Sequence, residues 1–119
     1  MDVLEGRRIL ILEEQIEIAQ LLVEMLRELR CQAVGPAKDV RGALALIAGD
    51  ELDAAILDVK IGGKNTLAVA DELIRRGIPF AFASGNKTPA SIKRYAPARL
   101  ITKPYSAENI HQVLCALLE

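Results

Sequence analysis

Four apolar segments of this 119-residue chain end in residues that could carry out phosphoryl or metal chemistry. These end residues are Glu13 and Glu14 after residues 8–12, Asp58 after residues 54–57, Ser84 after residues 79–83, and Lys103 after residues 98–102. Short apolar runs of this length predict buried strands. If the strands are parallel neighbours, their carboxyl ends share the sheet edge where open α/β sheets bind ligands.

The group types at that edge suit a divalent cation and a phosphoryl group. Carboxylates that lie close together repel one another, and a hard cation such as Mg²⁺ removes that repulsion through oxygen ligands. An ionised Asp58 can attack phosphorus and form an acyl phosphate. Lys103 and Ser84 would then hold the oxygens of the transferred group. We therefore predict a Mg²⁺ and phosphoryl site in which Glu13 and Glu14 lie beside Asp58.

The spacing of apolar residues predicts helices between strands. The predicted strands are residues 8–12, 32–34, 53–57, 79–83 and 98–101, with Gly35-Pro36 ending the second and Gly62-Gly63 forming a flexible loop. Five helices are predicted. The first has Ile16, Ala19, Val23, Leu26 and Leu29 on its inward face, and the third has Leu67, Ala70, Leu73 and Ile74 on its inward face. The second runs from the cap Asp39 to Gly49, the fourth from Thr88 to about Tyr95, and the fifth follows the cap Ser106. Such alternation predicts one α/β domain over residues 1–119, a flavodoxin-like (βα)5 doubly wound fold with a parallel sheet of order 2-1-3-4-5.

Composition narrows the function classes. The net charge is −1 and Trp is absent, which argues against a nucleic-acid surface. No apolar run approaches the roughly 20 residues of a membrane span, so we expect a cytoplasmic protein. Cys31 and Cys115 are expected to be reduced, packed thiols, and His111, the only histidine, a surface residue.

Motifs of other enzyme classes are missing. The chain has no GxGxxG, no P-loop and no GxSxG. A Ser-His-Asp triad would have to recruit His111 from a helix far from Ser84.

Taken in order, the strand-end motifs resemble the receiver domain of two-component response regulators over essentially the whole chain. The matching segments are residues 10–14 (LILEE), 56–58 (ILD), 82–85 (FASG) and 102–105 (TKPY). Residues 78–85 (IPFAFASG) further resemble the PFxFATG signature of a stand-alone receiver group that is associated with HWE-family histidine kinases.

This resemblance implies a role for each matching position. Asp58 would be the phosphoacceptor, with Mg²⁺ held by Glu13, Glu14, Asp58 and the backbone carbonyl of Lys60. Ser84 would be the phosphoryl-sensing hydroxyl and Lys103 the phosphoryl-pairing lysine, aimed by a cis peptide before Pro104.

The resemblance also implies partners. A sensor histidine kinase, of the HWE type by the PFxFATG resemblance, would donate the phosphoryl group. A downstream protein would bind the face made by the fourth helix, fifth strand and fifth helix, or the chain would act as a phosphate sink in a phosphorelay. We expect a monomer or weak dimer with no direct nucleic-acid or membrane partner. It would be no enzyme beyond its own Mg²⁺-dependent phosphorylation and dephosphorylation.

The sequence departs from the family pattern at four positions. Glu14 replaces the usual metal-binding Asp, Leu100 replaces the switch aromatic, Asn86 removes a substitute aromatic, and Gly62 stands where many members have proline. Glu14 and Leu100 support an alternative, a pseudo-receiver that binds partners with weak or absent Mg²⁺-dependent phosphorylation. A third class, a small acyl-phosphate hydrolase, would need an acid/base Asp where Lys60 stands and a cap segment to exclude water.

Overall fold

The computed structural model describes residues 3–61, 64–85 and 99–119. Its strands are β1 (Arg8–Leu12), β2 (Gln32–Ala37), β3 (Ala54–Asp58), β4 (Lys60–Ile61), β5 (Lys64–Asn65), β6 (Phe80–Ser84) and β7 (Arg99–Thr102). Its helices are α1 (Ile16–Glu28), α2 (Val40–Gly49), α3 (Leu67–Arg75) and α4 (Ala107–Leu118), the last of which is the predicted fifth helix. The helix predicted at residues 88–95 lies outside the described residues, as do Gly62, Gly63 and Asn86.

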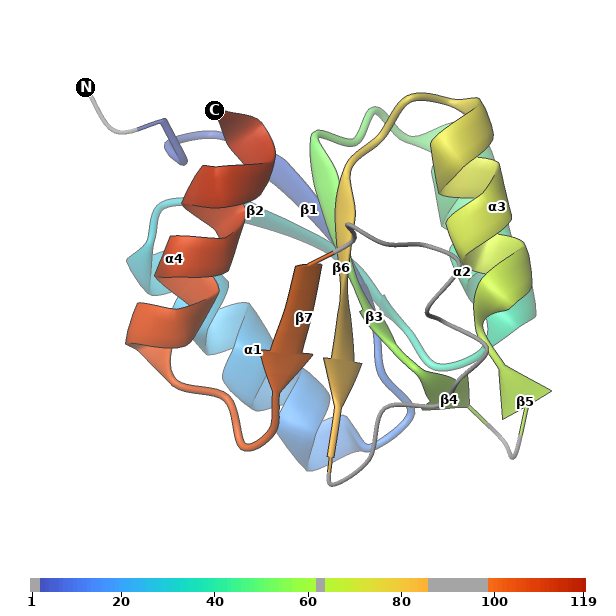
Figure 1. Ribbon diagram of the computed structural model, residues 1–119, viewed down its shortest axis with the longest axis horizontal. Coiled ribbons are helices and arrows are strands. Elements are labelled where there is room, and N and C mark those ends of the chain that lie inside the picture. The colour runs from blue at the N-terminus through green and yellow to red at the C-terminus, as the bar shows by residue number, and fades with distance from the viewer. Residues whose placement is uncertain (1–2, 62–63, 86–98) are drawn as a thin grey trace.

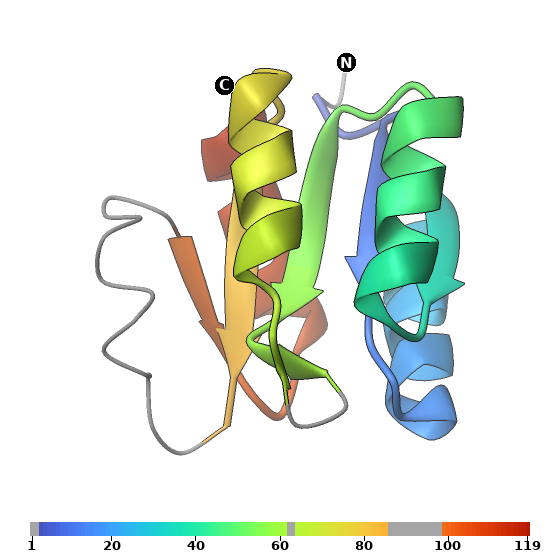
Figure 2. The ribbon, with the colours of Figure 1, turned by 90° about the vertical axis from the view of Figure 1, so that its right-hand side faces the viewer.

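Five parallel strands form the central sheet in the order β2-β1-β3-β6-β7. Numbered along the chain as core strands, this is the predicted order 2-1-3-4-5, so the doubly wound fold is confirmed. Helices α1 and α4 cover one face of the sheet and α2 and α3 cover the other (Figures 1 and 2). The carboxyl ends of the strands point to the lower edge in both views.

The central strands are apolar throughout because both faces of the sheet are covered. Successive side chains of a strand point to opposite faces. In β1, Ile9 and Ile11 pack with the α1 and α4 layer, whereas Leu10 and Leu12 pack with the α2 and α3 layer. All four are at most 1% exposed. This burial on both sides is the reason that the sequence shows unbroken apolar runs rather than alternation.

Two helices begin at residues that were predicted as caps. The Asp39 side chain accepts a hydrogen bond from the Gly42 amide at 2.7 Å, at the start of α2. The Ser106 side chain accepts one from the Asn109 amide at 3.1 Å, at the start of α4. Each bond satisfies an amide that has no partner within its own helix, so both caps are confirmed.

Two apolar residues that the helical spacing placed inward are exposed, and those predictions were wrong. Ile16 is 68% exposed at the first position of α1, and Ile74 is 55% exposed near the end of α3. Ile16 lies in the first turn of α1 and Ile74 in the last turn of α3. The apolar face with which each helix packs on the sheet is therefore narrower than the spacing of apolar residues predicted. The fully packed positions are Ala19, Leu22 and Leu26 in α1, and Val69, Ala70 and Leu73 in α3.

Strand β2 does not end at Gly35-Pro36, as was predicted, but continues to Ala37. The ladder with β1 shifts register between Leu10 and Leu12, which accommodates the extra residue. Proline is tolerated here because β2 is an edge strand. Gly35 has a φ of 95°, and a Cβ there would lie 2.6 Å from the Ala37 nitrogen, so the path of this strand requires glycine.

A short hairpin, which was not predicted, follows β3. Strands β4 and β5 pair antiparallel, with Lys60 opposite Asn65 and Ile61 opposite Lys64. The hairpin stands at the same edge of the molecule as the carboxyl ends of the sheet (Figure 1).

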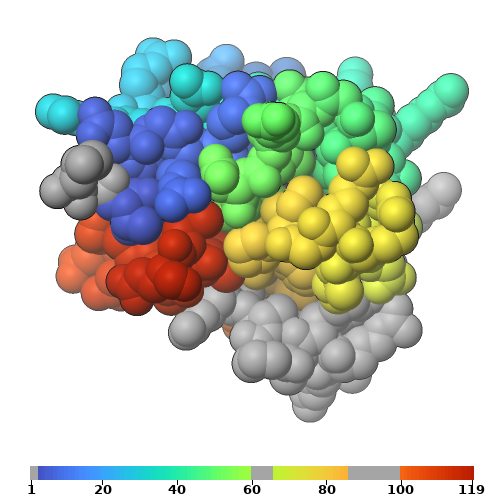
Figure 3. Space-filling model, turned by 90° about the horizontal axis from the view of Figure 1, so that it is seen from above, coloured from blue at the N-terminus to red at the C-terminus, as the bar shows by residue number. Residues whose placement is uncertain are grey.

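The beginning of the described chain packs beside its end. Leu4 is fully buried and shares a core cluster with Ile110 and Leu114 of α4. Figure 3 shows the amino-terminal segment (blue) adjoining α4 (red). Cys31 is a buried thiol and Cys115 a partly buried one, as predicted, and no disulfide joins them. None of the helices in the described part of the chain combines the length and apolar character that a membrane span requires.

Candidate phosphoryl site

Backbone pairing brings all four of the predicted strand ends to one edge of the sheet. Leu12 pairs with Leu57, so the next residues, Glu13 and Asp58, leave adjacent strands side by side. At the other flank of β3, the backbone amide of Lys103 donates to the Ser84 carbonyl at 2.9 Å. The register of a parallel sheet is therefore sufficient to assemble the site.

Lys103 forms a bridge between two carboxylates. Its ammonium nitrogen lies 2.8 Å from Asp58 Oδ2 and 2.9 Å from Glu13 Oε1. The side chains of Glu13, Asp58 and Lys103 are 1%, 15% and 20% exposed. Hydrogen bonds between ionised partners are short and strong when water is excluded from them.

Glu13 is held through both of its carboxylate oxygens. Oε1 accepts from Lys103, and Oε2 accepts from the backbone amide of Gln15 at 3.1 Å, just before α1. The backbone amide of Glu13 donates to the Ala37 carbonyl at 2.9 Å, which ties this residue to β2. Its carboxylate can be buried because it is paired with an opposite charge and hydrogen bonded.

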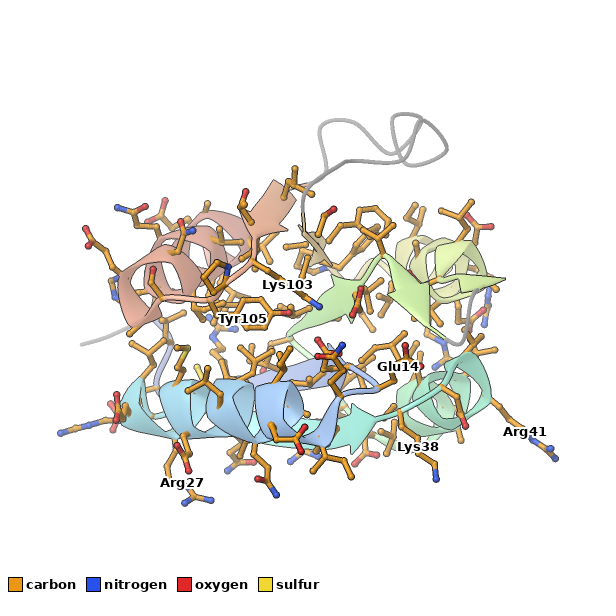
Figure 4. All side chains as sticks on the ribbon, turned by 90° about the horizontal axis from the view of Figure 1, so that it is seen from below. Glu14, Arg27, Lys38, Arg41, Lys103 and Tyr105 are labelled. Carbon is orange, nitrogen blue, oxygen red and sulfur yellow. The ribbon has the colours of Figure 1, made fainter. Side chains whose placement is uncertain are left out.

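The two carboxylates also set the titration of their neighbours. Burial alone would lower the pKa of Lys103, but its hydrogen bonds to Asp58 and Glu13 outweigh burial and raise that pKa above the usual lysine value. Burial, with the nearby charges of Glu13 and Asp58, raises the pKa of the Tyr105 phenol. The Lys103 nitrogen stands 5.9 Å from the centre of the Tyr105 ring, and Figure 4 shows the two side chains beside each other. Lys103 is thus kept as an ammonium and Tyr105 as a neutral phenol.

Glu14 does not join this cluster, although we expected it beside Asp58. Its side chain is exposed and lines a depression of about 670 Å³ together with Ile16, Lys38 and Leu46. Figure 4 shows it apart from Lys103 and Tyr105, nearer to α2. Strand β1 ends at Leu12 and Glu14 stands at a bend before α1, so the direction of its side chain is set by the path of this loop and not by the register of the sheet.

The donor set fits Mg²⁺ only in part. Mg²⁺ needs one or two carboxylates and takes its remaining ligands from water and phosphate. Glu13 and Asp58 supply two carboxylates that contact the same ammonium. Within residues 3–61, 64–85 and 99–119, no three His, Cys, Asp or Glu side chains converge to hold a metal ion. The residues present therefore suit a cation that is completed by water and by the phosphoryl group.

The remaining predicted residues lie around this centre. Ser84 ends β6 and is 7% exposed, and Lys60 begins β4 two residues after Asp58. The peptide before Pro104 is cis, as the resemblance implied. Leu100 is 44% exposed on β7, where the family places its switch aromatic.

Thr66 is a residue of the site that sequence reasoning missed. Its hydroxyl donates to the backbone carbonyl of Asp58 at 2.8 Å, and its side chain is fully buried. A threonine before an apolar helix is a recognisable cap candidate. Nothing in the sequence shows that its hydroxyl turns back toward the end of β3.

Solved structures similar to this chain include one from Sphingomonas. The solution structure of SdrG from Sphingomonas melonis Fr1 is 36% identical to it, covers 100% of both chains and has a TM-score of 0.83. The BeF3-activated conformation of SdrG from Pseudomonas melonis Fr1 is also 36% identical, covers 94% of this chain and 96% of that one, and has a TM-score of 0.79. A third similar structure is a CheY-like receiver domain from Methylobacillus flagellatus. It is 20% identical, covers 95% of this chain and 99% of that one, and has a TM-score of 0.83. At this level of identity the similarity shows the fold alone.

A comparison with protein families identifies the chain. No match to its sequence was found among curated proteins. The family model for the response regulator receiver domain, in contrast, matches residues 9–115 and so spans all of the site described above. The chain therefore belongs to the response regulator receiver domain family of two-component systems.

Proposed function

We propose that this receiver accepts a phosphoryl group on Asp58 from the phosphohistidine of a sensor histidine kinase. The observation that carries this proposal is the contact of 2.8 Å between Asp58 Oδ2 and the Lys103 ammonium at the carboxyl edge of the sheet. An aspartate at that edge can receive the group, and a lysine beside it can pair with the charge that arrives.

The transfer forms one bond and breaks one bond. A carboxylate oxygen of Asp58 bonds to phosphorus while the bond from phosphorus to the histidine nitrogen breaks, and the electron pair leaves with the imidazole. The Lys103 ammonium then pairs with phosphoryl oxygens, and the Ser84 hydroxyl donates to one of them. A bound Mg²⁺ would supply further positive charge to those oxygens, and Glu13, Asp58, the Lys60 carbonyl and a reoriented Glu14 are the groups proposed to hold it.

Similarity to SdrG supports this proposal. A BeF3-activated conformation has been described for SdrG, which is 36% identical to this chain. Beryllofluoride has the shape and charge of a phosphoryl group on a carboxylate. A chain with this level of identity is therefore expected to respond to the same reagent through Asp58.

The finer assignment is part of the proposal. The segment IPFAFASG at residues 78–85 favours a stand-alone receiver of the PFxFATG type, phosphorylated in the cytoplasm by a kinase of the HWE type. Its signal would pass by protein contact over the face that includes β7 and α4, or by withdrawal of phosphate from the kinase. In this proposal the chain acts on no separate substrate.

Phosphorylation by a small donor tests the proposal. With Mg²⁺ and acetyl phosphate, the intact mass should rise by one phosphoryl group, and Asp58→Asn should show no rise. Beryllofluoride should shift amide resonances near Asp58 in the parent and leave Asp58→Asn unchanged. An unmodified parent beside a responsive control receiver would contradict the assignment.

Kinase specificity is measured separately. Phosphotransfer from a panel of purified kinases should be faster from HWE-type members than from others. Equal rates from all kinases would remove the HWE assignment and leave phosphorylation of Asp58 in place.

One observation favours the pseudo-receiver as a second candidate. In the described part of the chain no three acidic, His or Cys side chains converge, so Mg²⁺ would find fewer preformed ligands than the resemblance implies. Under this candidate, Glu14→Asp should gain Mg²⁺ affinity strongly over the parent in a calorimetric titration. Equal affinities, together with normal phosphorylation of the parent, would exclude it.

A further inference from the structure

We propose that Thr66 is a positioning residue for the phosphoacceptor, whose hydroxyl holds the peptide after Asp58 so that the carboxylate faces Lys103. This inference rests on the proposed function, because it concerns the rate at which Asp58 is phosphorylated. It assigns to α3 a part in the chemistry of the site.

The peptide group between Asp58 and Val59 is anchored at both ends. Its carbonyl oxygen accepts from Thr66 Oγ1 at 2.8 Å, and its amide donates to the Ala83 carbonyl of β6 at 3.1 Å. A peptide group is planar, so two anchors on opposite sides fix its orientation. That orientation sets the ψ angle of Asp58 and hence the direction in which its side chain leaves the end of β3.

Thr66 is itself held by a rigid element. Its amide donates to the Val59 carbonyl at 3.2 Å, and its carbonyl accepts from the amides of Val69 and Ala70 at 3.1 Å each, in the first turn of α3. Val69 and Ala70 are fully buried against the sheet. Figure 2 shows α3 rising from the hairpin that follows β3. The hydroxyl therefore transmits the position of a packed helix to the acceptor residue.

The contact is more than a helix cap. Thr66 occupies the N-cap position of α3, where a threonine side chain ordinarily accepts from an amide of the first turn, but it makes no such bond. Its hydroxyl instead donates to the backbone carbonyl of Asp58, and it makes a longer contact of 3.4 Å with the Val59 carbonyl. Thr66 is 0% exposed and Val59 is 3% exposed, so water cannot easily replace a lost hydroxyl.

Three variants separate positioning from stability. Thr66→Val keeps the shape of the side chain and removes its donor, whereas Thr66→Ser keeps the donor. Ile47→Val in α2 trims a side chain that is 1% exposed and belongs to the core but not to the site, so it serves as a control for general destabilisation. Rates with acetyl phosphate at saturating Mg²⁺ are followed by intact mass and normalised to the folded fraction from circular dichroism.

We expect Thr66→Val to lower the maximal phosphorylation rate about tenfold or more, because misplacement of a reacting group by about 1 Å costs on the order of 100-fold. The half-saturating concentration of acetyl phosphate should not change, since donor binding does not involve Thr66. Thr66→Ser should stay within about threefold of the parent, and Ile47→Val should match the parent.

Each other outcome has a definite meaning. If the parent is phosphorylated and Thr66→Val reacts at the parental rate per folded molecule, Thr66 is only structural and the inference is wrong. If Thr66→Ser is as slow as Thr66→Val, shape rather than the hydroxyl matters and the inference is equally wrong. A parent that takes no phosphoryl group overturns the proposed function itself. Thr66→Ala replaces the valine variant if that variant does not fold.

Discussion

Removal of the Lys103 ammonium is the most direct test of how the site is held together. Lys103→Met keeps most of the length and apolar stem of the side chain and deletes its charge. The buried carboxylate of Glu13 and the carboxylate of Asp58 then lose the cation that they share at 2.9 and 2.8 Å.

The size of the effect follows from the exposure of each partner. A hydrogen bond to a charged group contributes about 1.5–3 kcal/mol. Asp58 is 15% exposed and can regain water in the variant, whereas Glu13 at 1% exposure cannot. We therefore count the full value of one charged hydrogen bond, the one between Lys103 and Glu13. The expected loss in the free energy of unfolding at neutral pH is about 2–3 kcal/mol.

Urea unfolding followed by far-ultraviolet circular dichroism measures this loss, because the chain has no Trp to serve as a fluorescence probe. Lys38→Met is the matched control: Lys38 is exposed, and its replacement should change stability by less than about 0.5 kcal/mol. Mg²⁺ should stabilise Lys103→Met more than it stabilises the parent, since the two carboxylates then lack their internal cation.

The pH dependence gives the sign of the interaction. The pKa of Lys103 is raised in the folded state, so the bridge contributes fully below the unfolded lysine value of about 10.4 and is lost as pH rises through the folded value. The stability difference between the parent and Lys103→Met should be constant at neutral pH and shrink only above pH of about 10.4. A variant that unfolds within about 0.5 kcal/mol of the parent at neutral pH would falsify the account of the bridge.

Three further predictions concern the phenol beside the site, a helix cap and the edge strand. Burial and the two carboxylates raise the pKa of Tyr105. Its ring-carbon resonance should therefore show no ionisation near pH of about 10, where an ordinary tyrosine is half ionised. A normal titration curve for Tyr105 would contradict this. Ser106→Ala removes the bond to the Asn109 amide and should cost about 1 kcal/mol in urea unfolding, whereas Ser106→Asp should retain most of the stability. Gly35→Ala places a Cβ 2.6 Å from the Ala37 backbone nitrogen at a φ of 95°, and it should lower the free energy of unfolding by more than about 1 kcal/mol. Gly49→Ala is the control, because a Cβ at Gly49 meets no atom within 4 Å, and it should leave stability unchanged or raise it. Equal effects of the two substitutions on unfolding would refute the steric argument.

The sequence alone was sufficient for the architecture because the architecture depends on local patterns. Unbroken apolar runs at residues 9–12 and 54–57 require strands buried on both faces, and the helical spacing between runs requires parallel crossovers. The caps Asp39 and Ser106 were readable for the same reason, since a cap bonds only three residues ahead. The continuation of β2 through Gly35-Pro36 could not be predicted in this way, because it depends on a register shift against β1 and on the edge position of the strand.

Sequence order also determined that Glu13, Asp58 and Lys103 would share one edge of the sheet, since each directly follows or ends a parallel strand. Only the tertiary structure decided which carboxylates the lysine contacts: Glu13 turns inward and Glu14 turns toward α2, a choice set by the direction of the chain as it leaves β1. Only the tertiary structure placed the Thr66 hydroxyl on the Asp58 carbonyl, because that bond joins residues eight positions apart across a hairpin. Strand ends are local features of a sequence, whereas the orientation of a side chain depends on everything that packs around it.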